Sequence, residues 1–355
     1  TLLFDNKFNI IRNTEVRFNT VLDDDGFECD DIERIEQWII TSLREIVSDS
    51  QYQVQALNIS TYGASLIYLD KNGKRLTPLY NYLKPIPEGF FDDFYERYGG
   101  VEEFSRITAS PAMGMLNSGL QILWLKMNKP EVFREVEHIL HFPNYLSYIL
   151  TKKCLCEYTS IGCHTAMWDF ENMQYHTWLS DEGIKLEKPV PNDFLQDISM
   201  NNKQLKVGTG IHDSSASLVP YVYGTNESFI LRSTGTWCIT MNPFNDELLT
   251  NEQLKRECTS YLSIHQKPVK SSQLFMGKIH DLNLKRINDH FGIPEDRYKK
   301  VPLDMKLLRT RLQSGNGTRR FFIHLGESEY LDNSVDLASF HSFDEAYHHL
   351  VFDLT

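Results

Sequence analysis

Residues 207–217 read VGTGIHDSSAS, and this stretch decides which kind of α/β fold the chain can adopt. Gly208-Thr209-Gly210 begins the GxGxxG pattern of a dinucleotide-binding loop, whose third glycine would fall at position 213. The chain carries Asp213 there. A side chain at that position blocks close helix–strand packing, and a carboxylate repels a pyrophosphate. A dinucleotide loop is therefore excluded, and the aspartate needs another explanation.

Asp213 follows a predicted strand over 206–210 and opens a predicted helix. An aspartate at a helix start most often caps the helix. It can also act through its charge, because the helix N-terminus keeps a carboxylate ionised, and an ionised carboxylate in a cleft can accept a proton from a hydroxyl. That is the task of a general base in phosphoryl transfer to an alcohol. Both interpretations stay open at this point.

Bulk composition restricts the class of protein. A chain of 355 residues is long enough for about two domains, and 41% hydrophobic with 24% charged residues is ordinary for a globular protein. The net charge of −12 argues against a nucleic-acid partner, which requires a basic face. There is no run of 18 apolar residues and no signal-peptide pattern, so no membrane association is expected. Six scattered cysteines are typical of reduced thiols in a cytoplasmic protein.

Strand and helix periodicities alternate along the chain, which predicts an α/β protein. We expect two domains, 1–224 and 225–355. Short strands and one helix after Asp30 or Asp31 fill the first 80 residues. The remaining expected elements are helices between 90 and 150 (one of them over 132–140), an irregular stretch over 186–202, a strand pair over 229–240 bent at 233–236, and helices at 272–291 and 343–354.

Two further segments place small polar residues at strand ends. Residues 232–237, RSTGTW, form either a hairpin turn or an anion-binding bend in which backbone N–H groups and Thr236 meet phosphate oxygens. Residues 58–64, NISTYGA, either end a strand without further role or present hydroxyls and an aromatic face where open α/β sheets bind ligands.

The sequence gives little support for a metal site, a P-loop or a hydrolase active site. Cys154-x-Cys156 with Cys163-His164 lacks the spacing of zinc ligand pairs, so no protein-bound metal is predicted. The chain has no P-loop, nucleophile elbow or H-E-x-x-H motif. His212-Asp213-Ser214 contains the residue types of a hydrolase triad, but the side chains of sequence neighbours diverge and cannot form the relay.

Taken in order, these segments resemble the FGGY carbohydrate kinases, most closely the rhamnulokinase-like branch. Residues 59–73, ISTYGASLIYLDKNG, are similar to that branch's Asp-Thr-Trp-Gly segment with its Leu-Asp-x-x-Gly turn. Residues 142–152, FPNYLSYILTK, with EYTS at 157–160 resemble its Pro-Asp-Tyr-x-x-Tyr-x-Leu-Thr-Gly and Glu-Tyr-Thr-Asn pair. Residues 210–217 and 233–237 resemble its His-Asp-Thr-Ala-Ser-Ala and Ser-Ser-Gly-Thr-Trp. The resemblance runs from residue 1 to about 290, and the ordered set is specific.

The resemblance implies two actin-like, ribonuclease-H-like domains around a central cleft, a sugar-binding one over 1–224 and a nucleotide-binding one over 225–355. ATP with Mg²⁺ would phosphorylate a hydroxyl of a ketose or deoxyketose such as rhamnulose, fuculose or xylulose. By position, Asp213 becomes the catalytic base. The residues expected at the sugar are His212, Thr61, Tyr62 and Gly63, and those expected at the ATP phosphates are Thr234, Gly235 and Thr236.

The chain also departs from the family pattern. The family's first strand, with its Asp-x-Gly-x-Thr loop, is expected to precede Thr1, and its Gly-Gly adenosine motif to follow Thr355, so both domains are expected to be incomplete here. Residues 81–85, NYLKP, replace the family's Tyr-Arg-Asp, and Leu274 and Leu282 stand where nucleotide contacts are expected. A catalytically degenerate member that senses sugar or nucleotide is therefore the alternative. A homodimer is allowed by the sequence, although no motif indicates one.

Overall fold

The computed structural model describes residues 1–234, 237–274, 276–313, 321 and 335–354. They divide into two compact units. Unit 1 contains Thr1–Phe229, Asn242–Leu254 and Thr259–Lys270, and unit 2 contains Ile230–Met241, Lys255–Cys258 and Ser271–Thr355. The predicted domain boundary after residue 224 stays a prediction.

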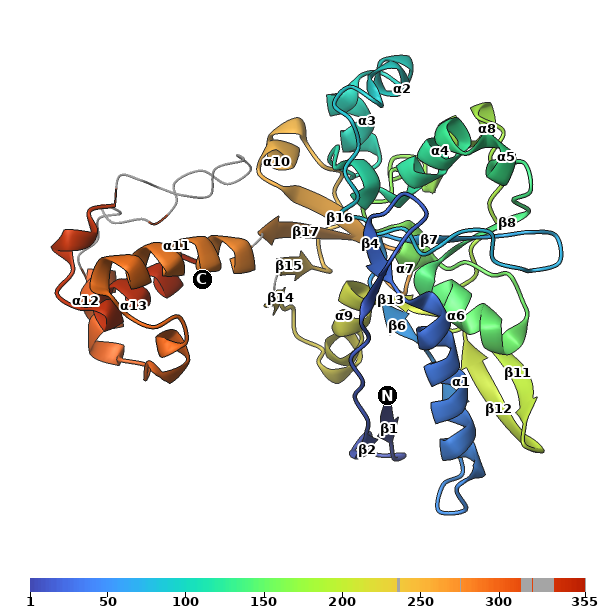
Figure 1. Cartoon of the computed structure of the whole chain (residues 1–355), viewed down its shortest axis with the longest axis horizontal. Helices are drawn as coiled ribbons and strands as arrows, with labels where there is room; N and C mark the ends of the chain where they lie inside the picture. Colours follow the sequence, from blue (N-terminus) through green and yellow to red (C-terminus); the bar gives the residue numbers. More distant parts are fainter. Residues whose placement is uncertain (235–236, 275, 314–320, 322–334, 355) are drawn as a thin grey trace. The chain divides into compact units, whose positions relative to one another are not determined.

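Unit 1 alternates short strands with helices (Figure 1). Its strands within residues 1–229 are β1 Leu2–Phe4, β2 Ile10–Asn13, β3 Thr20–Leu22, β4 Glu28–Asp30, β5 Ala56–Leu57, β6 Ser60–Thr61, β7 Leu66–Leu69, β8 His138–His141, β9 Trp168–Asp169, β10 Gln174–Tyr175, β11 Leu195–Met200, β12 Lys203–Gly208 and β13 Ile211–His212. Its helices there are α1 Ile32–Ser48, α2 Asp92–Arg97, α3 Val101–Ile107, η1 Gly114–Leu116, α4 Ser118–Asn128, α5 Pro130–Phe133, α6 Phe142–Thr151, α7 Tyr158–Ile161, α8 Trp178–Asp181 and α9 Asp213–Gly224.

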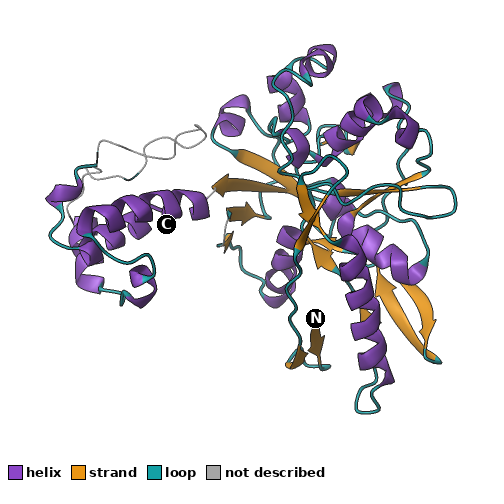
Figure 2. Cartoon of the chain, in the orientation of Figure 1, coloured by secondary structure: helices purple, strands orange, loops and turns teal. Residues whose placement is uncertain are grey.

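Strand β7 is buried on both faces and divides the core of unit 1. Its side chains alternate in direction, as the two-residue period of a strand requires. Leu66 and Tyr68 enter a cluster with residues of α4 such as Leu120. Ile67 and Leu69 enter a second cluster with residues of α1 and α6. A strand covered by helices on both sides is the layered arrangement of an α/β domain (Figure 2).

The predicted helix after residue 30 is confirmed as α1. The Asp31 side chain caps it by accepting a hydrogen bond from the Arg34 N–H at 3.1 Å. A charged first turn and an apolar stripe facing the core then favour the helix over other conformations.

Two parallel strand pairs carry the chain towards Asp213. β5 pairs with β12, and β6 pairs with β13 in the register Ser60–Ile211 and Thr61–His212. Between the two pairs the Asn58 side chain accepts the Gly210 N–H at 3.0 Å, replacing a missing backbone partner. Gly210 has φ 99°, and a Cβ there would lie 2.5 Å from the Pro143 carbonyl carbon and oxygen, so only glycine fits. The strands thus continue side by side to a shared carboxyl end.

The predicted helix over 132–140 is wrong. Helix α5 ends at Phe133, and β8 runs antiparallel to β7, with Ile139 opposite Tyr68. The apolar spacing of this segment suits a helix face, but β7 offers a backbone partner that no local pattern reveals. Tertiary pairing outweighs local periodicity at this position.

Residues 186–202 were expected to be irregular, but β11 lies within them and forms a hairpin with β12. The turn is Asn201-Asn202, with φ 49° and 61°. Positive φ at both central residues defines the turn that matches the twist of paired strands, and asparagine tolerates it. The Asn-Asn pair was the signal for this hairpin.

The remaining elements are β14 Leu231–Ser233, β15 Cys238–Asn242, α10 Asn251–Lys255, β16 Cys258–Leu262, β17 Pro268–Leu274, α11 Met276–Phe291, η2 Arg297–Lys300, α12 Met305–Gln313, η3 Leu337–Ser339 and α13 Phe343–Leu354. One four-stranded sheet has the order β14-β15-β17-β16. In unit 2, α11 packs against α13 through a cluster that includes Ile279, Ile287 and Leu350. The helices expected at 272–291 and 343–354 are thereby confirmed as α11 and α13, although 272–274 belong to β17.

Candidate active site

The carboxyl ends of β6 and β13 bring two of the predicted segments together. Tyr62 and Gly63 follow β6, and Asp213 follows β13, whose last residue His212 is paired with Thr61. A Cβ on Gly63 would lie 2.7 Å from His212 Cδ2, so the glycine lies directly against the imidazole. Ligands of open α/β sheets bind at this end of the strands.

Asp213 does not cap helix α9. The N-cap position is His212, and Asp213 is the first helical residue. Its Oδ1 accepts the Ser214 N–H at 2.6 Å and lies 3.2 Å from His212 Nε2 and 3.3 Å from Ser214 Oγ. Its Oδ2 has no partner in the part of the chain that the structure describes, and the side chain is 55% exposed. The carboxylate is thus held through Oδ1, and Oδ2 is left to accept a hydrogen bond from a ligand.

The backbone of His212 is bonded to a buried hydrogen-bond network. Its backbone N–H donates to Thr159 Oγ1 at 3.2 Å. Thr159 Oγ1 in turn donates to the fully buried Glu157 carboxylate at 2.6 Å, which also accepts the Thr159 and Ser160 N–H groups and the Asn192 amide. A buried carboxylate with four donors is fully satisfied and rigid. The network therefore fixes the backbone of His212, from which the imidazole extends to Asp213.

Three histidines near this end of the strands have lowered pKa values. Burial lowers the pKa of His212 below 6.5, and the negative charges of Asp213 and Glu157 oppose the shift. Burial, followed by the neighbouring His212, lowers the pKa of His164 to about 4 and that of His141 to about 3. These imidazoles are consequently neutral at physiological pH and offer one donor and one acceptor nitrogen each.

The hydroxyl of Tyr62 is occupied by a hydrogen bond, so the ring is the part of this side chain that is left to contact a ligand. The hydroxyl donates to Asp30 Oδ2 at 2.5 Å, and burial with this bond raises the pKa of Tyr62. Its ring lies 5.6 Å from that of Tyr82 and 5.2 Å from that of Phe142. Thr61 Oγ1 donates to the Tyr62 carbonyl at 2.8 Å.

Three aromatic residues near Asp213 were not among the predicted site residues. Burial, followed by the charge of Asp213, raises the pKa of Tyr82. The rings of His164 and Tyr261 lie 6.5 and 5.7 Å from that of His212. Tyr82 belongs to the segment 81–85 that departs from the family pattern, and this departure was the available signal.

The predicted phosphate-binding residues are only partly described. Thr234 is exposed and follows β14 in unit 2, whereas Gly235 and Thr236 lie outside the described residues. Their role at the ATP phosphates stays a prediction.

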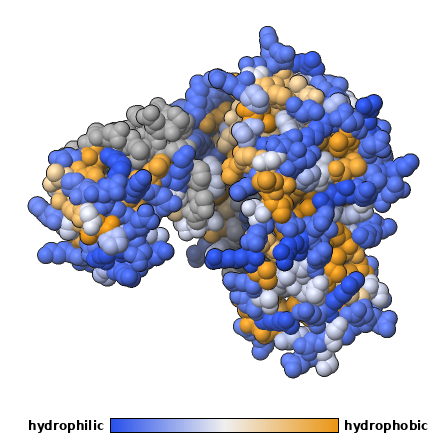
Figure 3. All heavy atoms as spheres, viewed as in Figure 1, coloured by the Kyte–Doolittle hydropathy of each residue, from blue (hydrophilic) through white to orange (hydrophobic). Residues whose placement is uncertain are grey.

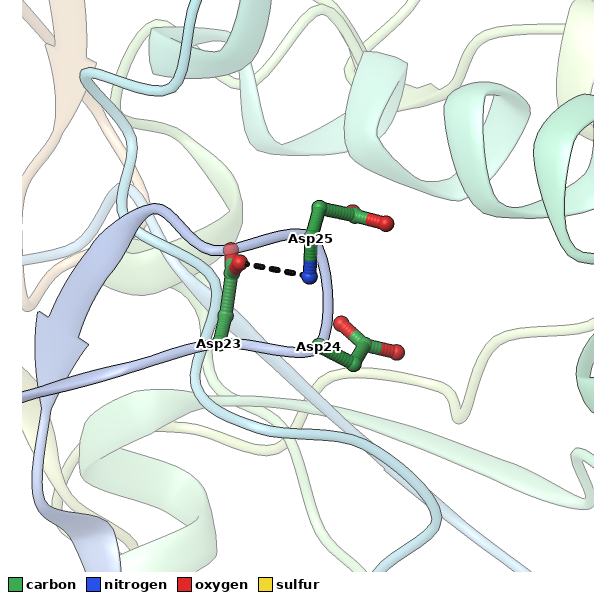
Figure 4. Close-up of side chains that lie close together, drawn as sticks. All are labelled: Asp23, Asp24 and Asp25. Atoms are coloured by element: carbon green, nitrogen blue, oxygen red, sulfur yellow. Dashed lines mark hydrogen bonds between the residues drawn. The ribbon is translucent and has the colours of Figure 1, made fainter.

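Among the described residues, the one group of three or more potential metal ligands is the turn Asp23–Asp25 (Figure 4). Lys84 Nζ lies 2.6 Å from Asp23 Oδ2 and 2.5 Å from Asp25 Oδ2, and Lys129 Nζ lies 2.6 Å from Asp24 Oδ2 and 2.9 Å from Asp25 Oδ1. Each of the three carboxylates is thus paired with at least one of two ammonium groups. The turn is therefore an ion-pair network that ties the β3–β4 hairpin to the rest of unit 1.

No helix in the described parts of the chain is both long and apolar enough to span a bilayer. Hydrophobic patches interrupt a mostly hydrophilic surface (Figure 3), as on most globular proteins.

Residues 1–186 match the model of the FGGY family of carbohydrate kinases, N-terminal domain. The chain is 24% identical over 233 residues to a rhamnulokinase of Oceanobacillus iheyensis, covering 62% of this chain and 48% of that one. It is 26% identical over 244 residues to a rhamnulokinase of Pectobacterium atrosepticum, covering 64% and 47%. The chain thus spans about half the length of these curated relatives.

Two solved structures show the same fold. A carbohydrate kinase from Novosphingobium aromaticivorans superposes with a TM-score of 0.73 at 19% identity, covering 98% of this chain and 76% of that one. A ligand-bound xylulose kinase from Lactobacillus acidophilus gives 0.70 at 16% identity, covering 84% and 62%.

Proposed function

Because the chain belongs to the FGGY family of carbohydrate kinases, we propose that it supplies the sugar site and catalytic base of an enzyme that transfers a phosphoryl group from ATP to a ketose or deoxyketose. Relatives and structural neighbours are named as rhamnulokinases and xylulose kinases. Rhamnulose and xylulose are therefore the substrates to test first, together with fuculose, which the sequence resemblance also implies.

The observation that carries the proposal is the asymmetry of the Asp213 carboxylate. Oδ1 is held by the Ser214 N–H and by His212 Nε2, while Oδ2 is unpartnered among the described residues and the side chain is exposed. An ionised carboxylate accepts hydrogen bonds only, so His212 donates through Nε2. A carboxylate fixed in this way is suited to general-base catalysis.

In the proposed reaction Asp213 Oδ2 accepts the proton of the sugar hydroxyl. At the same time the oxygen of this hydroxyl forms a bond to the γ-phosphorus of ATP. The bond between this phosphorus and the bridging oxygen breaks, and ADP leaves with the electron pair. His212 orients the carboxylate. The ring of Tyr62 and the backbone at Thr61 and Gly63 form the wall against which the sugar lies.

The nucleotide half of the site is proposed from the family resemblance. Thr234, with Gly235 and Thr236, would donate to the phosphate oxygens of ATP from the segment between β14 and β15. Mg²⁺, bound with ATP, would neutralise charge that develops between its β- and γ-phosphates. In this proposal Mg²⁺ arrives on the nucleotide, and the protein need not bind it alone.

The cellular setting is proposed from composition. All six cysteines are unpaired, in keeping with a reducing cytoplasm. The net charge of −12 supports the expectation that the protein binds no nucleic acid. A homodimer stays a prediction, which light scattering on the full-length protein tests.

The decisive variant is Asp213→Asn in the full-length protein. Removing the base should lower kcat for ADP release by roughly 10²–10⁴-fold. The melting temperature should hardly change, because the side chain is exposed. Asp193→Asn, at another exposed aspartate of unit 1, is the matched control and should keep wild-type turnover.

Near wild-type turnover by Asp213→Asn would refute the role of the base. Wild-type protein that is stabilised by a sugar yet releases no ADP with any member of the panel would instead favour the sensor alternative.

A further inference from the structure

His164 combines a strained backbone with a half-buried ring beside the proposed sugar site. Its φ is 44°, and that of Ala166 is 62°, although neither residue is glycine. Backbone of this kind costs about 1–2 kcal/mol per residue and persists only where the surroundings enforce it. Such strain often marks a functional position, so the contacts that hold His164 in this conformation indicate what its side chain could do.

The surroundings enforce this conformation through hydrogen bonds to the backbone of residues 164–166. The fully buried Asn117 donates from Nδ2 to the His164 carbonyl at 2.8 Å. One residue later, the Thr165 carbonyl accepts the Gly119 N–H at 2.8 Å, and the Ala166 N–H donates to Ser110 Oγ at 2.9 Å. These contacts fix the backbone from which the His164 ring extends, and the ring itself contacts the Leu116 carbonyl through Nδ1.

The two ring nitrogens of His164 have different surroundings. Nδ1 lies 3.3 Å from the Leu116 carbonyl, which only accepts, so Nδ1 carries the proton. Nε2 is then an acceptor, and it has no partner within the described ranges. The ring is half-buried, its pKa is lowered to about 4, and it faces the rings of His212 and Tyr261. A neutral, oriented acceptor is thus presented near Asp213.

We propose that His164 is a specificity-determining residue of the sugar site, where its Nε2 accepts a hydrogen bond from a second hydroxyl of the sugar bound at Asp213. This inference rests on the proposed function. The sugar bound at Asp213 must then carry a hydroxyl in the one configuration that reaches Nε2. An epimer that lacks it leaves the acceptor desolvated and unpaired, which is how a polar site rejects a close analogue.

Two substitutions separate this contact from a purely structural role. In His164→Asn the amide nitrogen takes the place of Nδ1, keeping the bond to Leu116, and asparagine tolerates positive φ, but the acceptor at the Nε2 position is lost. In His164→Gln the side-chain oxygen reaches the Nε2 position and restores an acceptor. His141→Gln is the matched control, because His141 is fully buried beside the same histidines and bonds to Ser118 Oγ.

The experiment measures kcat and KM of the full-length protein for rhamnulose and fuculose, which differ in the configuration of one hydroxyl. His164→Asn should raise KM for the preferred sugar about tenfold, change kcat less, and reduce the ratio of kcat/KM between the two sugars. His164→Gln should restore part of that ratio. His141→Gln should leave it unchanged, whatever it does to stability.

The results that would overturn the role of His164 differ from those that would overturn the kinase proposal. An unchanged ratio in His164→Asn, or an equal loss in His164→Asn and His141→Gln, overturns the role of His164 while leaving the kinase intact. If the wild type releases no ADP, calorimetric dissociation constants for the same two sugars replace kcat/KM and decide the question. If neither sugar binds the wild-type protein, the inference is overturned with the function on which it rests.

Discussion

At the scale of single residues, Gly63 shows how little space surrounds the His212 imidazole. A Cβ at this position would lie 2.6 Å from Cys163 Sγ and 2.7 Å from His212 Cδ2, and both side chains are buried. Neither neighbour is the free end of a flexible chain, so one of them must move. The absence of a side chain at 63 therefore controls the position of the residue that orients Asp213.

Gly63→Ala should consequently destabilise the protein by about 1–3 kcal/mol, as overpacking does, and raise KM for the sugar. Urea unfolding and ADP-release kinetics measure the two effects. Gly224→Ala is the control, because nothing lies within 4 Å of a Cβ there, and its effect should stay within about 0.5 kcal/mol. A Gly63→Ala protein as stable and active as the wild type would contradict this tight packing around residue 63.

At this scale the sequence pattern predicts the residues on consecutive strand ends but not those that loops bring to the site. Thr61, Tyr62 and Gly63 come next to His212 because parallel strands end at the same edge. The local pattern around His164 indicates only a poor zinc ligand, because no local rule predicts that its backbone has a positive φ. Long-range contacts create that conformation, so a single sequence could not reveal it.

At the scale of elements, the β11–β12 hairpin depends on its Asn201-Asn202 turn. Asn202 has φ 61° and no side-chain partner among the described residues, whereas the Asn201 side chain donates to Ser48 Oγ at 2.7 Å. Asn202→Gly should keep or slightly increase stability, because glycine adopts positive φ freely. Asn202→Val should cost about 1–2 kcal/mol, since a β-branched residue resists this conformation.

Melting temperatures of the two Asn202 variants, measured side by side, test the turn. The same loss of stability in both variants would mean that the asparagine side chain, rather than the backbone conformation, stabilises the hairpin.

The elements also show where pattern and fold diverge. The α/β class, the helix after Asp31 and the helix beginning at Asp213 are confirmed, because periodicity and, at Asp31, a side-chain cap are local properties. The helix predicted over 132–140 is wrong, because its apolar residues satisfy a strand pairing with β7 that lies about 70 positions away in sequence. Local signals establish which segments are regular more reliably than which partner each segment has.

At the scale of the whole molecule, the buried histidines couple stability to pH. An unfolded histidine binds a proton near pH 6.5, whereas folded His141 and His164 stay neutral until about pH 3 and 4. Below pH 6.5 the unfolded chain therefore binds more protons than the folded one, and acid favours unfolding. Each of these groups should cost up to about 1.4 kcal/mol per pH unit between pH 6.5 and 4.5.

Urea midpoints at pH 7 and pH 5 measure this dependence, and the midpoint should fall with acidification. His141→Gln, which removes one such group, should reduce the slope. A midpoint that is independent of pH in this range would show that these imidazoles are not kept neutral by the fold.

The pairing that builds the site also determines when the site can form during synthesis. Asn58 bonds to the backbone of Gly210, 152 positions further along the chain. At roughly 5–20 residues per second, a ribosome needs about 8–30 s to make that stretch. Throughout this interval the nascent segment that becomes β5 and β6 has no strand beside it. The strand ends beside Asp213 therefore cannot assemble before residues 211–212 have been made, and we expect the unpaired β5–β6 segment to be the part of unit 1 that most needs a chaperone until then.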